Sequence, residues 1–377
     1  MPHARCCVTT ASRPVANTEP GPEPALGNHA LDGLLCWCRP GFEPELAAEL
    51  GERSGALGLG GYARTERQSG VVLWLGDDGA ALDRALPFRD LIFARQKLRI
   101  LAELTLRDPH DRITPMLAAL KGRGVFGEVW VEHPDSEHGR PLAGLARSFG
   151  NALRRPLREH GVLTPTDDDT LPRLHVCFLD GAHALLASSR PQDASPWPLG
   201  VPRLRTHADA PSRSALKLEE ALFTLLDAGE RAQLLRPGMR AADLGAAPGG
   251  WSWVLSRHGI QVNAIDNGPM AASAMATGLI SHQRADGFTW QPAKPLDWMV
   301  CDMVEQPRRV ATRMGEWFAN GWCRQAIFNL KLPMKKRWLE TTLCLDLMQQ
   351  HAGRALNIRA RQLYHDREEI TVFAQVR

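Results

Sequence analysis

Residues 243–251 read DLGAAPGGW, and the segments on either side of this stretch indicate how it is used. The residues before it, RAADL, have the short apolar character of a buried strand, and the residues after it, WSWVLSRHG, have a helical pattern. Gly245, Gly249 and Gly250 allow the main chain to turn tightly and to approach a ligand closely. The sequence therefore predicts a strand that ends in a glycine-rich loop and leads directly into a helix.

The same alternation of strands and helices continues to the end of the chain. Further strands are expected at 261–266, 296–303, 325–332, 356–364 and 368–376. Alternation of this kind predicts an α/β fold with a doubly wound, mostly parallel sheet over residues 212–377. Ligands of such sheets bind beyond the carboxyl ends of the strands. Ionisable residues lie in or at the ends of several strands, namely Asp243, Asp266, Asp302 and Lys331.

The residues before this sheet predict smaller α+β units. A helix at 142–163 carries Arg147, Arg154, Arg155 and Arg158, and a hairpin with Asp180-Gly181 at its turn follows at 173–189. Five prolines fall within residues 190–212, so we expect a linker at 193–211. Residues 1–32 are rich in Pro, Ala, Thr and Gly without periodicity, which predicts a disordered extension.

The composition is that of a globular protein rather than a membrane or disulfide-stabilised one. The 377 residues are 44% hydrophobic and 23% charged, and no apolar run approaches the ~20 residues that span a bilayer. The eight cysteines lack zinc-finger spacing. We therefore expect a cytoplasmic protein without a membrane partner or a structural metal. Residues 201–377 hold 23 Lys+Arg against 17 Asp+Glu, a basic excess that weakly favours a polyanionic partner.

The glycine-rich loop narrows the choice of ligand. It lacks the G-x-G-x-x-G of dinucleotide-binding proteins, and no G-K-[ST] follows it, so neither NAD nor a nucleoside triphosphate is favoured. An acidic residue before the loop suits a ligand with a cationic amino group, which favours S-adenosylmethionine. Asp266 ends the second strand, where a carboxylate can accept both ribose hydroxyls. Asp286 can accept the adenine amino group or, equally well, form an Asp-Gly turn.

Lys331 is the least expected residue of the C-terminal half. It ends the apolar strand IFNL in a chain where only seven of the 45 basic residues are lysines. Arginine cannot lose its proton in a protein, whereas lysine can be tuned to do so. Lys217 precedes the first strand, Asp302 ends another, and Glu369 begins the last. Together with Lys331 they form a Lys-Asp-Lys-Glu set suited to removing a proton from a hydroxyl.

This set, together with DLGAAPGG, resembles the tetrad of ribose 2′-O-methyltransferases. The likeness extends over residues 34–377 to the RlmM family of bacterial large-subunit ribosomal RNA methyltransferases. The matching segments are LCWCRPGFE, LPFRDLIFARQ, DRITPM, DAPSRSALKLEEA, DNGPM, MVCDMVEQP, NGWCRQAIFNLKLPMKKR and RQLYHDREEITV. The sequence departs from the family at Ala247, where cysteine is frequent, although a main-chain contact there would be unaffected.

The resemblance implies a ferredoxin-like unit at 33–100, an RNA-binding THUMP domain at 101–192 and a Rossmann-like methyltransferase domain at 212–377. It implies a monomer that methylates the 2′-hydroxyl of one cytidine in 23S rRNA near the peptidyl transferase centre. Lys331 would be the general base. The cofactor contacts implied for S-adenosylmethionine are Ser214, Ala247, Pro248, Gly249, Gly250, Asp266, Asp286 and Asp302.

Three alternatives remain open from the residues alone. The chain could methylate a 2′-hydroxyl of tRNA or of another rRNA site. It could be a non-catalytic RNA-binding protein on a methyltransferase fold, although such a protein would be expected to have lost part of the tetrad. An NAD-linked oxidoreductase is disfavoured by the missing dinucleotide fingerprint.

Overall fold

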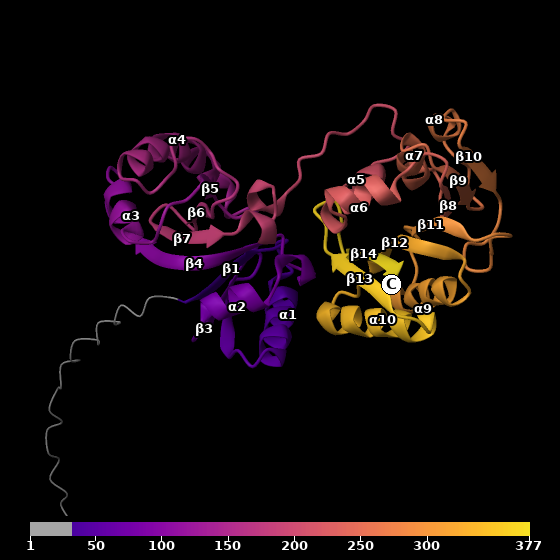
Figure 1. Cartoon of the computed structure of the whole chain (residues 1–377), viewed down its shortest axis with the longest axis horizontal. Coiled ribbons are helices and arrows are strands. Elements are labelled where there is room, and N and C mark those ends of the chain that lie inside the picture. The colour runs from indigo at the N-terminus through magenta and orange to yellow at the C-terminus, as the bar shows by residue number, and fades with distance from the viewer. Residues whose placement is uncertain (1–31) are drawn as a thin grey trace, which may run out of the picture. The chain divides into compact units, whose positions relative to one another are not determined.

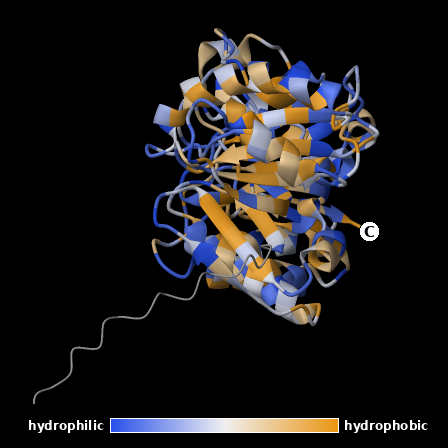
Figure 2. Cartoon of the chain, turned by 90° about the vertical axis from the view of Figure 1, so that its left-hand side faces the viewer, coloured by the Kyte–Doolittle hydropathy of each residue, from blue (hydrophilic) through white to orange (hydrophobic). Residues whose placement is uncertain are grey.

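The computed structural model describes residues 32–377, so almost all of the extension expected at 1–32 lies outside the described residues. The described part contains two seven-stranded sheets (Figure 1). Hydrophobic residues are concentrated in the strands, whereas the connecting loops are largely hydrophilic (Figure 2). Within residues 32–377, no helix combines the length and the apolar character needed to cross a membrane.

The first sheet has the strand order β2-β3-β1-β4-β7-β6-β5. Its strands are β1 (Gly33–Trp37), β2 (Gly61–Thr65), β3 (Val71–Gly76), β4 (Gln96–Thr105), β5 (Glu128–Glu132), β6 (Arg173–Phe178) and β7 (His183–Ser189). β4 pairs with β1 through residues 96–99 and with β7 through residues 99–105. The boundary expected between residues 100 and 101 therefore falls inside a strand that belongs to both N-terminal units.

Four α-helices accompany this sheet: α1 (Glu43–Ala56), α2 (Gly79–Ala85), α3 (Ile113–Leu120) and α4 (Ala143–Glu159). Short 3₁₀ segments lie at Phe88–Asp90, Arg140–Leu142, Pro191–Asp193 and Pro198–Gly200. α4 buries Phe149 and Leu153 against the sheet. Its arginines are exposed except Arg154, which is half-buried and donates a hydrogen bond of 3.0 Å to the Val129 carbonyl. Arg154 and Arg158 lie 3.7 and 3.6 Å from Asp167. These acidic neighbours offset part of the positive charge expected on the helix.

The second sheet confirms the α/β fold with a mostly parallel, doubly wound sheet. Its strand order is β10-β9-β8-β11-β12-β14-β13, and β14 alone runs antiparallel to its neighbours. The strands are β8 (Arg240–Leu244), β9 (Gln261–Ile265), β10 (Ile280–Gln283), β11 (Leu296–Cys301), β12 (Cys323–Lys331), β13 (Leu356–Arg361) and β14 (Glu369–Val376). The helices are α5 (Ala215–Leu225), α6 (Ala228–Leu234), α7 (Gly250–Arg257), α8 (Ala272–Met275), α9 (Pro307–Ala319) and α10 (Arg337–Ala352).

Both faces of this sheet are covered, as its apolar strands require. Successive residues of a strand point to opposite faces. In β11, Met299 and Cys301 pack in one core with α9 and α10, whereas Trp298 and Val300 pack in the other with α5 and α7. Figure 1 shows the same division, with α9 and α10 on one side of the sheet and α5 and α7 on the other. Two cores fix the sheet, so the carboxyl ends of its strands are held rigidly.

The glycine-rich loop joins β8 to α7 as predicted, and two of its glycines are needed for different reasons. Gly249 has φ +109° and is the N-cap of α7, a left-handed conformation that favours glycine. Gly250 is needed for space, because a Cβ there would lie 2.5 Å from the hydroxyl oxygens of both Ser212 and Ser214. The loop therefore packs directly against the segment that precedes α5.

We predict that Gly250→Ala destabilises the protein by roughly 1–3 kcal/mol, the usual cost of overpacking a tight contact. Gly144→Ala in α4 is the matched control, because a Cβ at that position meets nothing within 4 Å. The control should be neutral or stabilising by up to ~1 kcal/mol, since alanine favours helices. Urea denaturation of the three proteins measures both effects. Equal free energies of unfolding for the two variants would contradict the packing argument.

Candidate active site

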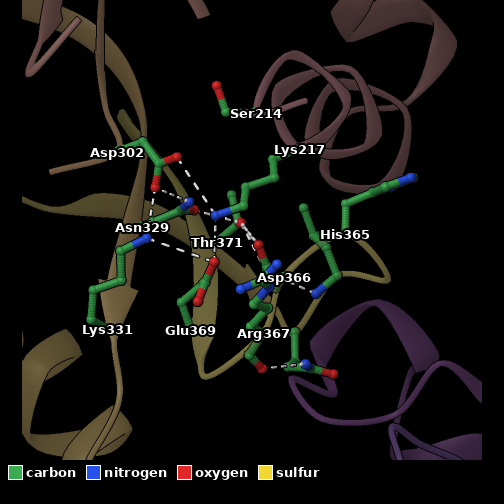
Figure 3. A network of polar contacts seen from close by, with 12 residues as sticks. Ser214, Lys217, Asp302, Asn329, Lys331, His365, Asp366, Arg367, Glu369 and Thr371 are labelled. Atoms are coloured by element: carbon green, nitrogen blue, oxygen red, sulfur yellow. Dashed lines mark hydrogen bonds and ion pairs between the residues drawn. The ribbon is translucent and has the colours of Figure 1, made fainter. Parts of the chain in front are cut away.

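The four residues of the predicted tetrad meet at the carboxyl edge of the second sheet (Figure 3). Lys331 is the last residue of β12, Asp302 directly follows β11, Glu369 begins β14, and Lys217 lies in the first turn of α5. The antiparallel register of β12 and β14 pairs Lys331 directly with Glu369. Residues from four separate elements are thus brought to one point by strand pairing and helix packing.

Each carboxylate of the tetrad contacts both lysines. Lys331 Nζ donates a hydrogen bond of 2.7 Å to Asp302 Oδ1 and lies 3.6 Å from Glu369 Oε1. Lys217 Nζ donates to Glu369 Oε1 and lies 3.6 Å from Asp302 Oδ2. Burial lowers the pKa of Lys217, but Asp302 and Glu369 together outweigh that effect and hold it above its usual value. Lys217 is therefore a permanent cation of the cluster.

A cavity of about 250 Å³ adjoins the tetrad and shares Asp302 with it. It is lined by Ser212, Ser214, Asp243, Gly245, Ala246, Ala247, Pro248, Trp251 and Asp302. Asp243 is 1% exposed, and its carboxylate accepts a hydrogen bond of 2.7 Å from Ser252 Oγ. Burial raises its pKa to about 7, and the nearby carboxylates of Asp302 and Asp266 add to this shift. An acidic group in a cavity of this kind suits a cationic ligand.

The structure gives Asp266 a local role that sequence reasoning did not anticipate, and it gives Asp286 one that sequence reasoning did consider. Asp266 Oδ2 accepts a hydrogen bond of 3.0 Å from the Ala247 N–H, and its Oδ1 accepts one of 2.6 Å from the Gly268 N–H. Asp266 thereby holds the glycine-rich loop from the neighbouring strand. Asp286 is exposed and accepts the Phe288 N–H at 2.9 Å, which is the turn-forming role considered above. Contacts of either carboxylate with a cofactor stay predictions.

Ser214 and the loop residues lie together as the sequence suggested. The Ser214 hydroxyl is 2.6 Å from that of Ser212, and its carbonyl accepts a hydrogen bond of 3.0 Å from Trp251 Nε1. Cys301, next to Asp302, is buried, and burial raises its pKa to about 12, so it is not a nucleophile. Among residues 32–377, no group of three His, Cys, Asp or Glu side chains could hold a metal ion.

Sequence reasoning missed three polar residues behind the tetrad, namely Asn329, Thr371 and Asp366. Asn329 and Thr371 are fully buried, and Asp366 is 1% exposed. An asparagine in the middle of the apolar run IFNLKL was an available signal, because a buried amide needs partners. Its partners are Asp302, 27 positions earlier, and Thr371, 42 positions later, so the sequence alone could not identify them.

Comparison with known proteins identifies the family to which the chain belongs. Family models match an RlmM ferredoxin-like domain at residues 31–98, the N-terminal part of ribosomal RNA large subunit methyltransferase M at 111–190, and an FtsJ-like methyltransferase at 210–335. The chain is 65% identical to Ribosomal RNA large subunit methyltransferase M of Xanthomonas campestris pv. campestris strain B100, over 91% of this chain and 99% of that protein. The chain belongs to the RlmM family.

The RlmM relative of Xanthomonas axonopodis pv. citri strain 306 is also 65% identical over the same shares of both chains. Among solved structures, TrmN from Thermus thermophilus is 20% identical with a TM-score of 0.35, covering 91% of this chain and 99% of that one. A likeness that distant carries no argument about individual residues. Membership of the RlmM family, with an FtsJ-like domain, makes the chain an S-adenosylmethionine-dependent methyltransferase. The family model that matches residues 111–190 does not name a THUMP domain, so the assignment of one to 101–192 stays a prediction.

The buried carboxyl of Asp243 leads to a prediction on pH. A cationic ligand favours the ionised carboxylate, so the affinity for S-adenosylmethionine should rise as pH increases through about 7. Asp243→Asn should bind more weakly above pH 7 and should show a flatter profile. Calorimetry of both proteins between pH 5.5 and 8.5 measures this, and titration of the ligand itself cancels in the comparison. Parallel profiles would show that Asp243 does not titrate on binding.

Proposed function

We propose that this RlmM-family protein transfers the methyl group of S-adenosylmethionine to the ribose 2′-hydroxyl of one cytidine in 23S rRNA, near the peptidyl transferase centre. The observation that carries the proposal is a Lys-Asp-Lys-Glu cluster that shares Asp302 with the adjoining cavity. Two relatives that are 65% identical bear the name of a large-subunit rRNA methyltransferase. The choice of a cytidine and its position rest on the family resemblance.

The residues of the cavity fit the cofactor. When bound, S-adenosylmethionine supplies a methyl group on a positively charged sulfur, which is already activated for attack by an oxygen. Asp243 lines the cavity with a buried carboxyl group, which carries a negative charge when it is ionised. Asp266 accepts a hydrogen bond from the Ala247 N–H and so fixes the conformation of the glycine-rich loop. These contacts position a cation beside Asp302.

The chemistry left to the protein is to orient the 2′-hydroxyl and to accept its proton. Lys331 is the candidate base, because its side chain is 21% exposed and can be reached by a substrate. With all four residues ionised, the tetrad has no net charge. Loss of a proton from Lys331 leaves it at −1, and a cationic cofactor next to Asp302 compensates for that charge.

We propose that the loops after Asp302 and Lys331 form the entrance to the tetrad, and each of them carries one exposed apolar residue. Val304 is 89% exposed and follows Asp302 by two residues, and Met334 is 73% exposed and follows Lys331 by three. β11 and β12 are adjacent parallel strands, so both side chains leave the same edge of the sheet. We propose that they contact the base or sugar of the target nucleotide. Lys335 and Lys336, also exposed, are placed to contact phosphates.

We propose that the N-terminal sheet binds RNA, that the protein acts in the cytoplasm, and that it is a monomer. The first point is supported by the separate sheet and by Arg147 on α4, which is exposed and forms no ion pair among the described residues. A non-catalytic RNA-binding role is disfavoured, because all four tetrad residues are present and in contact. Methylation of another RNA remains the nearest alternative, and mapping 2′-O-methylation in rRNA from a deletion strain distinguishes the two.

Replacing Lys331 with arginine tests the base directly. Lys331→Arg keeps the charge but cannot release the proton, so we predict a methyl-transfer rate reduced roughly 10²–10⁴-fold, as for loss of a general base. Lys335→Arg is the matched control and should cost far less. The measurement is single-turnover methylation of 23S rRNA at several pH values. A Lys331→Arg enzyme within a few-fold of wild type would make Lys331 an electrostatic clamp and not a base.

Replacing the two apolar residues tests the nucleotide contact. We predict that Val304→Ser with Met334→Ser lowers kcat/KM for RNA about five- to thirtyfold, since burying one or two such groups on binding is worth ~1–2 kcal/mol. The affinity for S-adenosylmethionine should not change. Leu343→Ser on α10, another exposed apolar position, is the control. If the control lowers kcat/KM as much as the double variant does, the contact is not specific to this entrance.

A further inference from the structure

Three buried polar residues form a continuous line behind Asp302 (Figure 3). Asn329 of β12 and Thr371 of β14 are register partners, and Asp366 lies in the turn before β14. Polar groups this deeply buried are normally placed for a partner, since an unpaired one costs free energy. In this case neighbouring members of the line are hydrogen-bonded to one another, and Asn329 at one end is hydrogen-bonded to Asp302 of the tetrad.

The line is defined by short contacts. Asn329 Nδ2 donates to Asp302 Oδ1 at 2.7 Å, which is the same oxygen that accepts from Lys331 at 2.7 Å. Thr371 Oγ1 lies 2.7 Å from Asn329 Oδ1, and 3.1 and 3.3 Å from the two carboxyl oxygens of Asp366. Asp366 Oδ2 also accepts the Leu363 N–H at 2.9 Å.

The direction of these hydrogen bonds follows from the chemistry of the groups. The carboxylate of Asp302 only accepts, so Asn329 must turn its amide nitrogen toward it and its oxygen toward Thr371. Thr371 has one hydroxyl proton, and the shorter contact gives that proton to Asn329. Thr371 then has no proton left to give to Asp366. The hydrogen bond between them must therefore be donated by the carboxyl group of Asp366 to Thr371 Oγ1, which requires Asp366 to carry a proton. In that state every buried group of the line has a partner.

We propose that Asp366, Thr371 and Asn329 form a positioning relay that holds Asp302 against Lys331, and that the relay is complete only while Asp366 is protonated. This inference rests on the proposed role of Lys331 in methyl transfer. Asn329 shares Asp302 Oδ1 with Lys331 and takes up part of its negative charge. The relay thereby weakens the hold of Asp302 on the ammonium form of Lys331 while fixing its position.

The surroundings of Asp366 support a neutral carboxyl. Burial raises its pKa to about 8; the negative charges of Glu369 and Glu220 add to this, whereas the Leu363 N–H and Lys217 oppose it. His365 beside it is already engaged by Glu220 at 2.6 Å. Arg39 donates to the main-chain carbonyl of Asp366 at 2.8 Å and not to its carboxyl. No cation among the described residues is hydrogen-bonded to the side chain.

Ionisation of Asp366 breaks the relay. The Thr371 hydroxyl then turns toward the new carboxylate, and Asn329 Oδ1 loses its donor. A buried negative charge is also added near Lys217 and Lys331, which favours their charged forms. Methyl transfer should therefore gain less from rising pH above about 8 than the deprotonation of Lys331 alone would give.

Variants of Thr371 test the relay by their kinetics. Thr371→Val keeps the shape and removes the hydroxyl, and Thr371→Ser keeps the hydroxyl. With saturating RNA and cofactor, Thr371→Val should slow single-turnover methylation roughly tenfold, the effect of one lost buried hydrogen bond. Thr371→Ser should remain within about threefold of wild type, with cofactor affinity unchanged in both variants. Equal rates for the two variants would overturn the relay.

Asp366→Asn tests the proton. An asparagine can accept from Leu363 and donate permanently to Thr371, so this variant should keep the wild-type rate at pH 7 and exceed wild type above pH 8. An inactive but folded Asp366→Asn protein, or one with an unchanged pH profile, would overturn the proposal.

Thermal unfolding gives a readout that does not depend on RNA. The folded protein keeps a proton on Asp366 that the unfolded chain has lost, so this group lowers stability as pH rises from about 4 to about 8. Asp366→Asn should flatten that dependence of Tm. If it does so while Lys331→Arg remains active, Asp366 is protonated but the role of Lys331 is wrong. If the dependence is unchanged, the relay itself fails.

Discussion

Lys217, Asp302, Lys331 and Glu369 attract one another by charge, and each carboxylate is within 4 Å of both ammonium groups. Such a cluster can stand half-buried only if its charges balance, because an unpaired buried charge is costly. The sheet supplies the means, since the β12–β14 register and the packing of α5 bring the four residues together without freedom to separate. Asp302 also lines the cavity. The charge of a bound ligand and the charges of the two lysines therefore act on the same carboxylate.

Much of the C-terminal architecture could be predicted from the sequence because its signals are local. The glycine-rich loop, the apolar strands and the charged strand ends each occupy a few consecutive residues. The tetrad could be assembled because its members stand at strand or helix ends, where a parallel sheet gathers side chains. The contact between Lys331 and Glu369 depends on an antiparallel partner strand, and that pairing came from the family resemblance rather than from periodicity.

The features that were missed depend on residues far apart in the sequence. The hydrogen bonds from the Ala247 and Gly268 amides to Asp266 were not anticipated, and its expected contact with a ribose stays a prediction. The closeness of Asp167, which lies beyond α4, to Arg154 and Arg158 was not anticipated either. Asn329 gave only a faint signal, because its meaning depends on Thr371 and Asp366. Patterns of hydrophobicity do not encode which buried polar groups will meet.

The sharing of β4 has a consequence for how the N-terminal sheet folds. Residues 96–99 of β4 are paired with β1, and residues 99–105 are paired on its other edge with β7. Loss of either partner strand leaves unpaired main-chain groups along the part of β4 that it covered. The two halves should therefore melt in one cooperative step, and hydrogen exchange should protect β4 more uniformly than a strand at the margin of a domain. A chain cut between residues 100 and 101 would divide β4, and each fragment would expose strand edges with unpaired main-chain groups.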